Sequence, residues 1–122
     1  MVLEPTLTDL LIVEDNPFIG ESIVNAAKEH SGIGTLRLTE TLQEAITFLN
    51  TTNFGVIVLD LNLPDGSGLE LLKIIKEEKI KTKVFVFSVN TELKNICLRY
   101  GAAAFFDKAN DFDKLIETIK AA

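Results

Sequence analysis

Residues 54–59, FGVIVL, are almost entirely apolar and are followed at once by an acidic residue, Asp60. Runs that are apolar at every position, and not only at alternate ones, are typical of strands covered on both faces, as in a parallel sheet. Other runs rich in apolar residues span residues 10–13, 35–38, 84–87 and 103–106. The run at 35–38 alternates apolar and polar residues, so we expect it at an edge of the sheet.

Between these runs the apolar residues recur every three or four positions, which is the period of an amphipathic helix. One such stripe follows each of the five runs. Five strand–helix units with short connections predict a doubly wound α/β sandwich, because crossovers between parallel strands are right-handed. The apolar stripes are Ile19, Ile23, Ala26 and Ala27; Leu42, Ile46 and Leu49; Leu69, Leu72, Ile75 and Ile80; Leu93, Ile96, Cys97 and Tyr100; and Leu115, Ile116 and Ile119.

The predicted helix starts carry capping signals, which are polar side chains that can accept hydrogen bonds from the first free backbone N–H groups. A proline at the first helical position supports the first of them. The candidates are Asn16 before Pro17, Thr41 with Glu44, Ser67 with Glu70, and Asn110 or Asp111.

The chain of 122 residues, 47% of them hydrophobic, is long enough for one domain over residues 1–122 to bury its own core. A single cysteine, Cys97, excludes a disulfide framework and a cysteine-based zinc site. The formal net charge of −6 disfavours direct contact with nucleic acid, because phosphates repel an acidic surface. No run approaches the ~20 apolar residues of a membrane span, and the first residues lack the basic segment of a signal peptide. We therefore expect a cytoplasmic protein with no membrane contact.

Charged or polar side chains follow four of the five predicted strands. Glu14 and Asp15 come after the first strand, Asp60 after the third, Ser88 after the fourth and Lys108 after the fifth. Doubly wound sheets carry their sites at the carboxyl ends of the strands. These three carboxylates, one hydroxyl and one ammonium are therefore predicted to meet at one edge of the sheet.

Three carboxylates held close together raise one another's pKa, and a divalent cation relieves that repulsion. Oxygen ligands suit Mg²⁺ or Ca²⁺, and Mg²⁺ combines a few carboxylates with phosphate oxygens. An ammonium such as Lys108 and a hydroxyl such as Ser88 can contact phosphoryl oxygens. Asp60, at the end of the most apolar strand, is the best candidate for a carboxylate nucleophile that forms an aspartyl phosphate.

The sequence resembles the receiver domain of two-component response regulators over nearly its full length. The resemblance implies a flavodoxin-like (βα)5 fold, a doubly wound parallel sheet with strand order 2-1-3-4-5. The positions that carry it are Glu14, Asp15, Asp60, Asn62, Pro64, Gly68, Ser88, Phe105 and Lys108.

The same resemblance implies a signalling phosphoacceptor that catalyses its own phosphorylation and aspartyl-phosphate hydrolysis, and not a metabolic enzyme. Asp60 would accept a phosphoryl group from a histidine kinase or a histidine phosphotransfer protein. Asp15, Asp60 and the backbone carbonyl of Asn62 would ligate Mg²⁺, and Glu14 would act mainly through bound water. Whether the chain is a stand-alone receiver or the receiver of a larger regulator stays open.

The resemblance further implies a switch. Ser88 and Phe105 would be the coupled switch pair, and Lys108 would contact the phosphate. The switch would change the surface formed by the fourth helix, the fifth strand and the fifth helix. A downstream protein target, or a second copy in a phosphorylation-dependent dimer, would recognise the changed surface.

The sequence departs from the family's pattern at three positions. Val89 follows Ser88 where a smaller residue is frequent, and Phe105 replaces a frequent tyrosine. Ala109 follows Lys108 where the family usually has proline, often after a cis bond. A cis bond before a residue other than proline costs about 2.5–4 kcal/mol. A trans bond with an altered loop is therefore an alternative to the family's cis bond.

Phe18 lies off the apolar stripe of the first helix, next to the predicted acidic site, whereas Ile19 lies on it. The resemblance implies that phosphodonor proteins dock over the first helix and the loop after the fifth strand, which includes Ala109. An exposed aromatic at such a place is a candidate docking anchor. The alternative is that Phe18 packs on the neighbouring loop.

Two other site classes fit the sequence less well. A phosphatase of the haloacid dehalogenase class needs a second Asp two residues after the nucleophile, where this chain has Asn62. A flavin or dinucleotide module needs a glycine-rich loop after the first strand, where this chain has Glu14 and Asp15.

Overall fold

The structure is a computed structural model that describes residues 7–122. The expectation about a signal peptide falls on residues 1–6, outside the described residues. No helix in the described part is long and apolar enough to cross a membrane.

The elements are β1 (Thr8–Val13), α1 (Pro17–Lys28), β2 (Ile33–Thr39), α2 (Leu42–Thr51), β3 (Val56–Leu59), β4 (Asn62–Leu63), β5 (Gly66–Ser67), α3 (Gly68–Glu77), β6 (Lys83–Ser88), the 3-10 turn η1 (Thr91–Leu93), α4 (Lys94–Arg99), β7 (Ala104–Asp107) and α5 (Phe112–Ala121).

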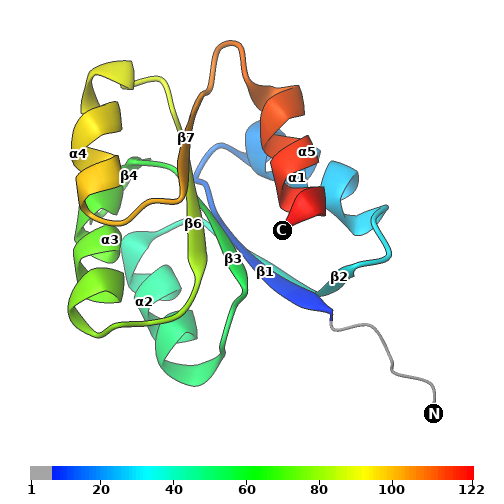
Figure 1. Ribbon diagram of the computed structural model, residues 1–122, viewed down its shortest axis with the longest axis horizontal. Helices are drawn as coiled ribbons and strands as arrows, with labels where there is room; N and C mark the ends of the chain where they lie inside the picture. The colour runs from blue at the N-terminus through cyan, green and yellow to red at the C-terminus, as the bar shows by residue number, and fades with distance from the viewer. Residues whose placement is uncertain (1–6) are drawn as a thin grey trace.

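Five parallel strands form one sheet in the order β2-β1-β3-β6-β7. Counted without the short β4–β5 hairpin, this is the predicted order 2-1-3-4-5, so the doubly wound fold is confirmed. Figure 1 shows α1 and α5 on one face of the sheet and α2, α3 and α4 on the other. β3 lies at the centre with all four residues buried, and β2 lies at an edge, as its alternating pattern predicted.

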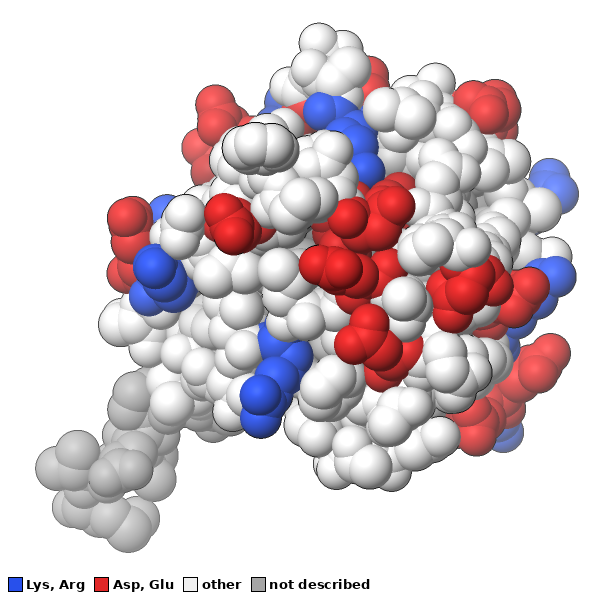
Figure 2. All heavy atoms as spheres, turned by 180° about the vertical axis from the view of Figure 1, so that it is seen from behind, with Lys and Arg blue, Asp and Glu red and all other residues white. Residues whose placement is uncertain are grey.

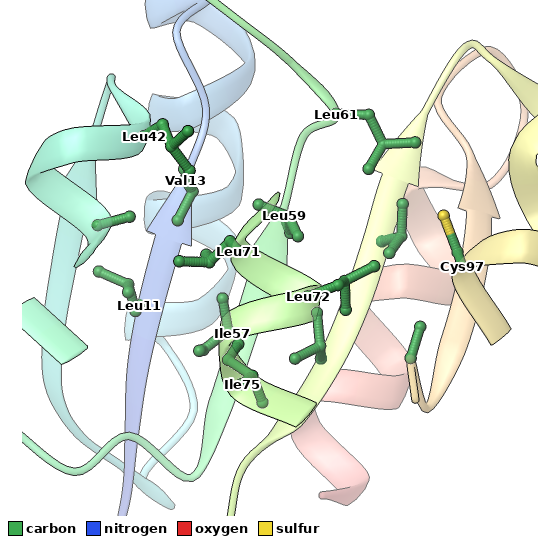
Figure 3. Packing of buried hydrophobic residues seen from close by; sticks show 14 of the residues in the cluster. Leu11, Val13, Leu42, Ile57, Leu59, Leu61, Leu71, Leu72, Ile75 and Cys97 are labelled. Atoms are coloured by element: carbon green, nitrogen blue, oxygen red, sulfur yellow. The ribbon is translucent and has the colours of Figure 1, made fainter. Parts of the chain in front are cut away.

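Alternate residues of each strand point to opposite faces, so the sheet separates two apolar cores. Leu11 and Val13 of β1 pack in the core under α2, α3 and α4 (Figure 3), whereas Leu10 and Ile12 pack under α1 and α5. β1, β3 and β6 contribute to both cores. This two-sided burial explains why their sequences read as continuous apolar runs.

The fourth helix is shorter than its apolar stripe indicates. α4 has six residues, Cys97 is its only buried residue, and Leu93 and Tyr100 lie just outside it. The Tyr100 ring lies 5.4 Å from the Nζ atom of Lys73 in α3. Lys76, also in α3, donates a hydrogen bond of 2.9 Å from Nζ to the carbonyl of Arg99. These two contacts join the C-terminal end of α4 to α3.

Three of the predicted side-chain caps form. Asn16 accepts from the amides of Phe18 and Ile19, Thr41 from that of Glu44 and Ser67 from that of Leu69. Asp111, one of the two predicted candidates, is the N-cap residue of α5, but its side chain makes no capping hydrogen bond. The Asp111 carboxylate instead accepts from the backbone N–H of Asp107, at 2.9 Å.

Candidate functional site

The carboxyl ends of β1, β3, β6 and β7 meet at one edge of the sheet. Backbone hydrogen bonds continue the pairing beyond the strands. The Asp60 N–H donates to Val13, Glu14 to Thr39 and Lys108 to Ser88, over 2.9–3.0 Å. The positions of these residues are therefore set by the sheet itself. The structure brings the predicted carboxylates and ammonium together here, with Ser88 at the end of the strand next to β3.

Carboxylate oxygens of Glu14, Asp15 and Asp60 lie within 4.8 Å of one another. Glu14 and Asp60 are buried, whereas Asp15 is exposed. Figure 2 shows that Asp and Glu side chains gather on one face of the molecule. Such a set of oxygen donors, close together and open to solvent on one side, fits a hard divalent cation.

Lys108 lies between two of the carboxylates. Its Nζ atom is 2.7 Å from Oε1 of Glu14 and 3.3 Å from Oδ2 of Asp60. The other oxygen of Asp60, Oδ1, accepts a hydrogen bond of 3.2 Å from the N–H of Asn62. Burial raises the pKa of Glu14 to about 7, against the lowering effect of the Lys108 ammonium. The Asp60 carboxylate is thus held at both oxygens, and Lys108 makes its shorter contact with Glu14.

Ser88 is fully buried at the end of β6. Its Oγ atom accepts a hydrogen bond of 3.0 Å from the N–H of Asn90, so the hydroxyl proton is available for donation. Phe105 lies on the adjacent strand, opposite Val86, and is half-buried against the core under α2, α3 and α4. The predicted switch pair therefore occupies neighbouring edge and near-edge strands.

The loop after β7 holds Lys108 without a cis bond, because the described residues contain no cis peptide. The Ala109 N–H donates to Oδ1 of Asp107 at 3.0 Å, and Nδ2 of Asn110 donates to Oδ2 of Asp107 at 3.1 Å. Proline at 109 would have no N–H for the first of these bonds. Asp107 is not among the predicted site residues, and Asp111 is predicted only as a helix cap, although both are short polar side chains that favour such turns.

The loop after β3 is packed closely against the core. Leu61 and Leu63 on either side of Asn62 are buried, and the Gly68 N–H donates to the Leu61 carbonyl at 2.9 Å. A Cβ atom on Gly68 would lie 2.4 Å from the backbone oxygen of Asp60. Only glycine therefore allows α3 to start this close to the aspartate.

The three predicted docking residues differ in exposure. Phe18 is 83% exposed, which rules out that it packs on the neighbouring loop. Ile19 is half-buried against the core, and Ala109 is exposed. Val89, directly after Ser88, is also exposed. An apolar ring at the start of α1, three residues after Asp15, is thus open to solvent.

The fold is shared with a known protein family. Residues 10–120 match the model of the response regulator receiver domain. The chain therefore belongs to the response regulator receiver family, whose members act in two-component signalling.

Two curated relatives are similar along most of the chain. Transcriptional regulatory protein MalR of Bacillus subtilis is 31% identical over 110 residues, which are 88% of this chain and 47% of MalR. Cell cycle response regulator CtrA of Brucella ovis is 33% identical over 114 residues, 92% of this chain and 48% of CtrA. The chain spans about half the length of these relatives.

Solved structures of receiver domains have the same fold as this chain. The receiver domain of a Francisella response regulator superposes with a TM-score of 0.84 at 30% identity, over 93% of this chain and 94% of that one. A CheY-like receiver domain protein from Methanospirillum hungatei has the same fold, with a TM-score of 0.84 at 24% identity over 95% and 93%.

Proposed function

We propose that this domain is a phosphoacceptor in which Asp60 takes a phosphoryl group from a phosphohistidine of a histidine kinase or histidine phosphotransfer protein. The observation that carries the proposal is the position of Asp60. It is buried at the end of the central strand, with Lys108 on one oxygen and the Asn62 amide on the other. A fixed carboxylate with a nearby cation is suited to attack on phosphorus.

In this reaction a carboxylate oxygen of Asp60 forms a bond to phosphorus while the bond from phosphorus to the imidazole nitrogen breaks. The imidazole keeps the electron pair and takes a proton from solvent. Lys108, now 3.3 Å from Asp60, contacts the phosphoryl oxygens, and Ser88 donates its free hydroxyl proton to them. Hydrolysis of the resulting aspartyl phosphate would return the domain to its starting state.

Mg²⁺ is the proposed cofactor, and when bound it would neutralise negative charge on the phosphoryl oxygens. Asp15, Asp60 and the backbone carbonyl of Asn62 would hold it, with Glu14 acting through water. The support is the all-oxygen donor set within 4.8 Å formed by the three carboxylates.

The output of the switch is proposed to be the surface of α4, β7 and α5. Donation by Ser88 to a phosphoryl oxygen draws its side chain toward Asp60, and Phe105 on the next strand turns inward. A downstream protein, or a second phosphorylated copy, would bind the altered surface. The domain itself makes no contact with nucleic acid or membrane in this proposal, and it works in the cytoplasm.

Intact mass spectrometry after incubation with acetyl phosphate and Mg²⁺ tests the proposal. We expect the mass to increase by one phosphoryl group in the wild type and not in Asp60→Asn. Asp113→Asn, at an exposed aspartate in the first turn of α5, is the matched control and keeps the label. Equal labelling of Asp60→Asn contradicts the proposal, as does a wild type that takes neither acetyl phosphate nor beryllofluoride.

The phosphodonor is proposed to dock over Phe18, Ile19 and Ala109. Replacement of Phe18 by Ala removes the exposed ring and should slow transfer from a phosphorylated histidine protein while acetyl phosphate labelling stays unchanged. If both reactions slow together, Phe18 has a structural role. If neither changes, the docking surface lies elsewhere.

A further inference from the structure

The β4–β5 hairpin begins at Asn62, two residues after the proposed phosphoacceptor. It is very short: Asn62 pairs with Ser67 and Leu63 with Gly66, with Pro64 and Asp65 at the tip. Its base is closed by the bond from the Gly68 N–H to the Leu61 carbonyl. Two residue pairs alone do not hold a hairpin in one place, so other contacts must fix its tip.

The tip is fixed to α2 by the side chain of Asp65. Its Oδ1 accepts from the N–H of Leu42 at 2.7 Å, and its Oδ2 from the N–H of Gln43 at 2.9 Å. These are the first two backbone donors of α2, and each is bonded to a separate oxygen of one carboxylate. The two bonds lower the pKa of Asp65, so the carboxylate stays charged near neutral pH.

Few other hydrogen bonds join this hairpin to the rest of the described chain. Ser67 accepts from the Leu69 N–H of α3, and the Asn62 N–H donates to Oδ1 of Asp60 at 3.2 Å. The one further side-chain bond that residues 62–67 make to the rest of the described chain is a long contact of 3.5 Å from Nδ2 of Asn90 to Oδ1 of Asn62. A Cβ atom on Gly66 would lie 2.9 Å from the Leu42 side chain, so the hairpin also lies directly against the first residue of α2. The Asp65 carboxylate is thus the main polar link between the hairpin and the body of the domain.

We infer that Asp65 is a positioning residue for the metal-binding loop, residues 60–65, which carries the proposed Mg²⁺ ligands Asp60 and Asn62. By tying the hairpin tip to α2, it holds the backbone of Asn62, whose carbonyl is a proposed Mg²⁺ ligand and whose N–H bonds Asp60. Asp65 itself stands outside the carboxylate cluster and touches neither the metal nor the phosphoryl group. This inference rests on the proposed function, because it assigns Asp65 to that same site.

A purely structural role for Asp65, as a cap of α2, makes a different prediction. Thr41 also caps α2, by accepting from the N–H of Glu44 at 3.1 Å, but it does so from within the helix start and has no bond to the hairpin. Thr41→Ala therefore weakens the same helix without releasing the metal-binding loop, and is the matched control for Asp65→Ala.

The test is a titration of each variant with Mg²⁺ alone, in which the amide NMR signals of Asn62 and Asp60 report binding. We expect Asp65→Ala to raise the Mg²⁺ dissociation constant about tenfold, the lower end of the loss when an outer-shell partner is removed. Thr41→Ala should leave it within about twofold, although both variants lower the unfolding midpoint. Asp65→Asn keeps one acceptor and should recover part of the Mg²⁺ affinity.

Labelling by acetyl phosphate gives the second measurement. Asp65→Ala should need more Mg²⁺ for half-maximal labelling but reach a rate near that of the wild type at saturating Mg²⁺. The inference is overturned if Asp65→Ala and Thr41→Ala change Mg²⁺ affinity equally, or if neither does. A wild type that binds no Mg²⁺ and takes no label contradicts the proposed function instead, so the two failures are distinguishable.

Discussion

Two segments leave the same edge of the sheet from adjacent strands, and they are built in opposite ways. The segment after β3 carries Asp60 and is anchored in the core: Leu61 and Leu63 are buried, and Gly68 lies directly against the Asp60 backbone. The segment after β6 begins beyond Ser88, the last residue of that strand, and opens to solvent. Val89 is exposed, and neither η1 nor α4 has a side-chain cap at its start.

The difference separates two requirements of the proposed phosphorylation switch. A nucleophile works best when its geometry is fixed before the donor arrives. A surface that must change after phosphorylation is drawn from the least stable part of the fold. The packed segment therefore suits the chemistry, and the open segment, with one buried residue in α4, suits the response.

Truncation of one leucine in each segment should give the largest difference in the free energy of unfolding between the two. Leu61 is 2% exposed and Leu98 of α4 is 41% exposed. Leu61→Ala leaves a cavity in the core, and we expect a loss of about 2–5 kcal/mol in the free energy of unfolding. Leu98→Ala should change it by less than about 0.5 kcal/mol. Urea unfolding measures both, and similar losses would show that the two segments are equally packed.

Gly68 gives the next largest effect. Gly68→Ala places a Cβ atom against backbone that cannot move without moving Asp60, so we expect a loss of about 1–3 kcal/mol in unfolding free energy and slower labelling by acetyl phosphate. Gly20→Ala in α1 is the control, because the Cβ atom there meets only the flexible end of Leu38 at 3.1 Å. It should change stability by less than about 1 kcal/mol. Normal labelling of a folded Gly68→Ala variant would contradict the tight fit.

Native-state hydrogen exchange compares the two segments without a mutation. The amides of α4 should exchange about tenfold faster than those of α3, because α4 buries one side chain and α3 buries four residues. Beryllofluoride should then shift NMR signals across residues 88–115. Shifts confined to residues around the carboxylate cluster would argue against a mobile response segment.

The smallest expected effect is on the free energy of unfolding at acidic pH. Hydrogen bonds from Gln43 and Leu42 hold the pKa of Asp65 below its usual range in the folded state. Its contribution to stability is therefore full above the unfolded pKa of about 3.9 and is lost as the pH falls through the folded pKa. Asp65→Asn should flatten the fall in unfolding free energy below about pH 4 and leave its slope near neutral pH unchanged. Identical acid profiles would show that these bonds do not favour the charged carboxylate.

The features that could be predicted from sequence are those with a local signature. The apolar run ending at Asp60 identified the central strand, and the residues directly after the other strands identified the rest of the cluster, since parallel strands end at one edge. The β4–β5 hairpin has strands of two residues, too short to show a period. The Asp65 bonds to α2 span 22 and 23 residues in sequence, so no local pattern indicates them.

The contact of Tyr100 with Lys73 has a practical consequence. The chain contains one tyrosine and no tryptophan, so the near-ultraviolet emission of the unlabelled protein comes essentially from a single phenol ring. Tyr100 is the C-cap residue of α4, and its ring lies beside the Lys73 ammonium of α3. The ring therefore lies between the open segment after β6 and the helix that follows the packed segment after β3. Its intensity and lifetime therefore give an intrinsic optical readout of α4 moving relative to α3, with no fluorophore added.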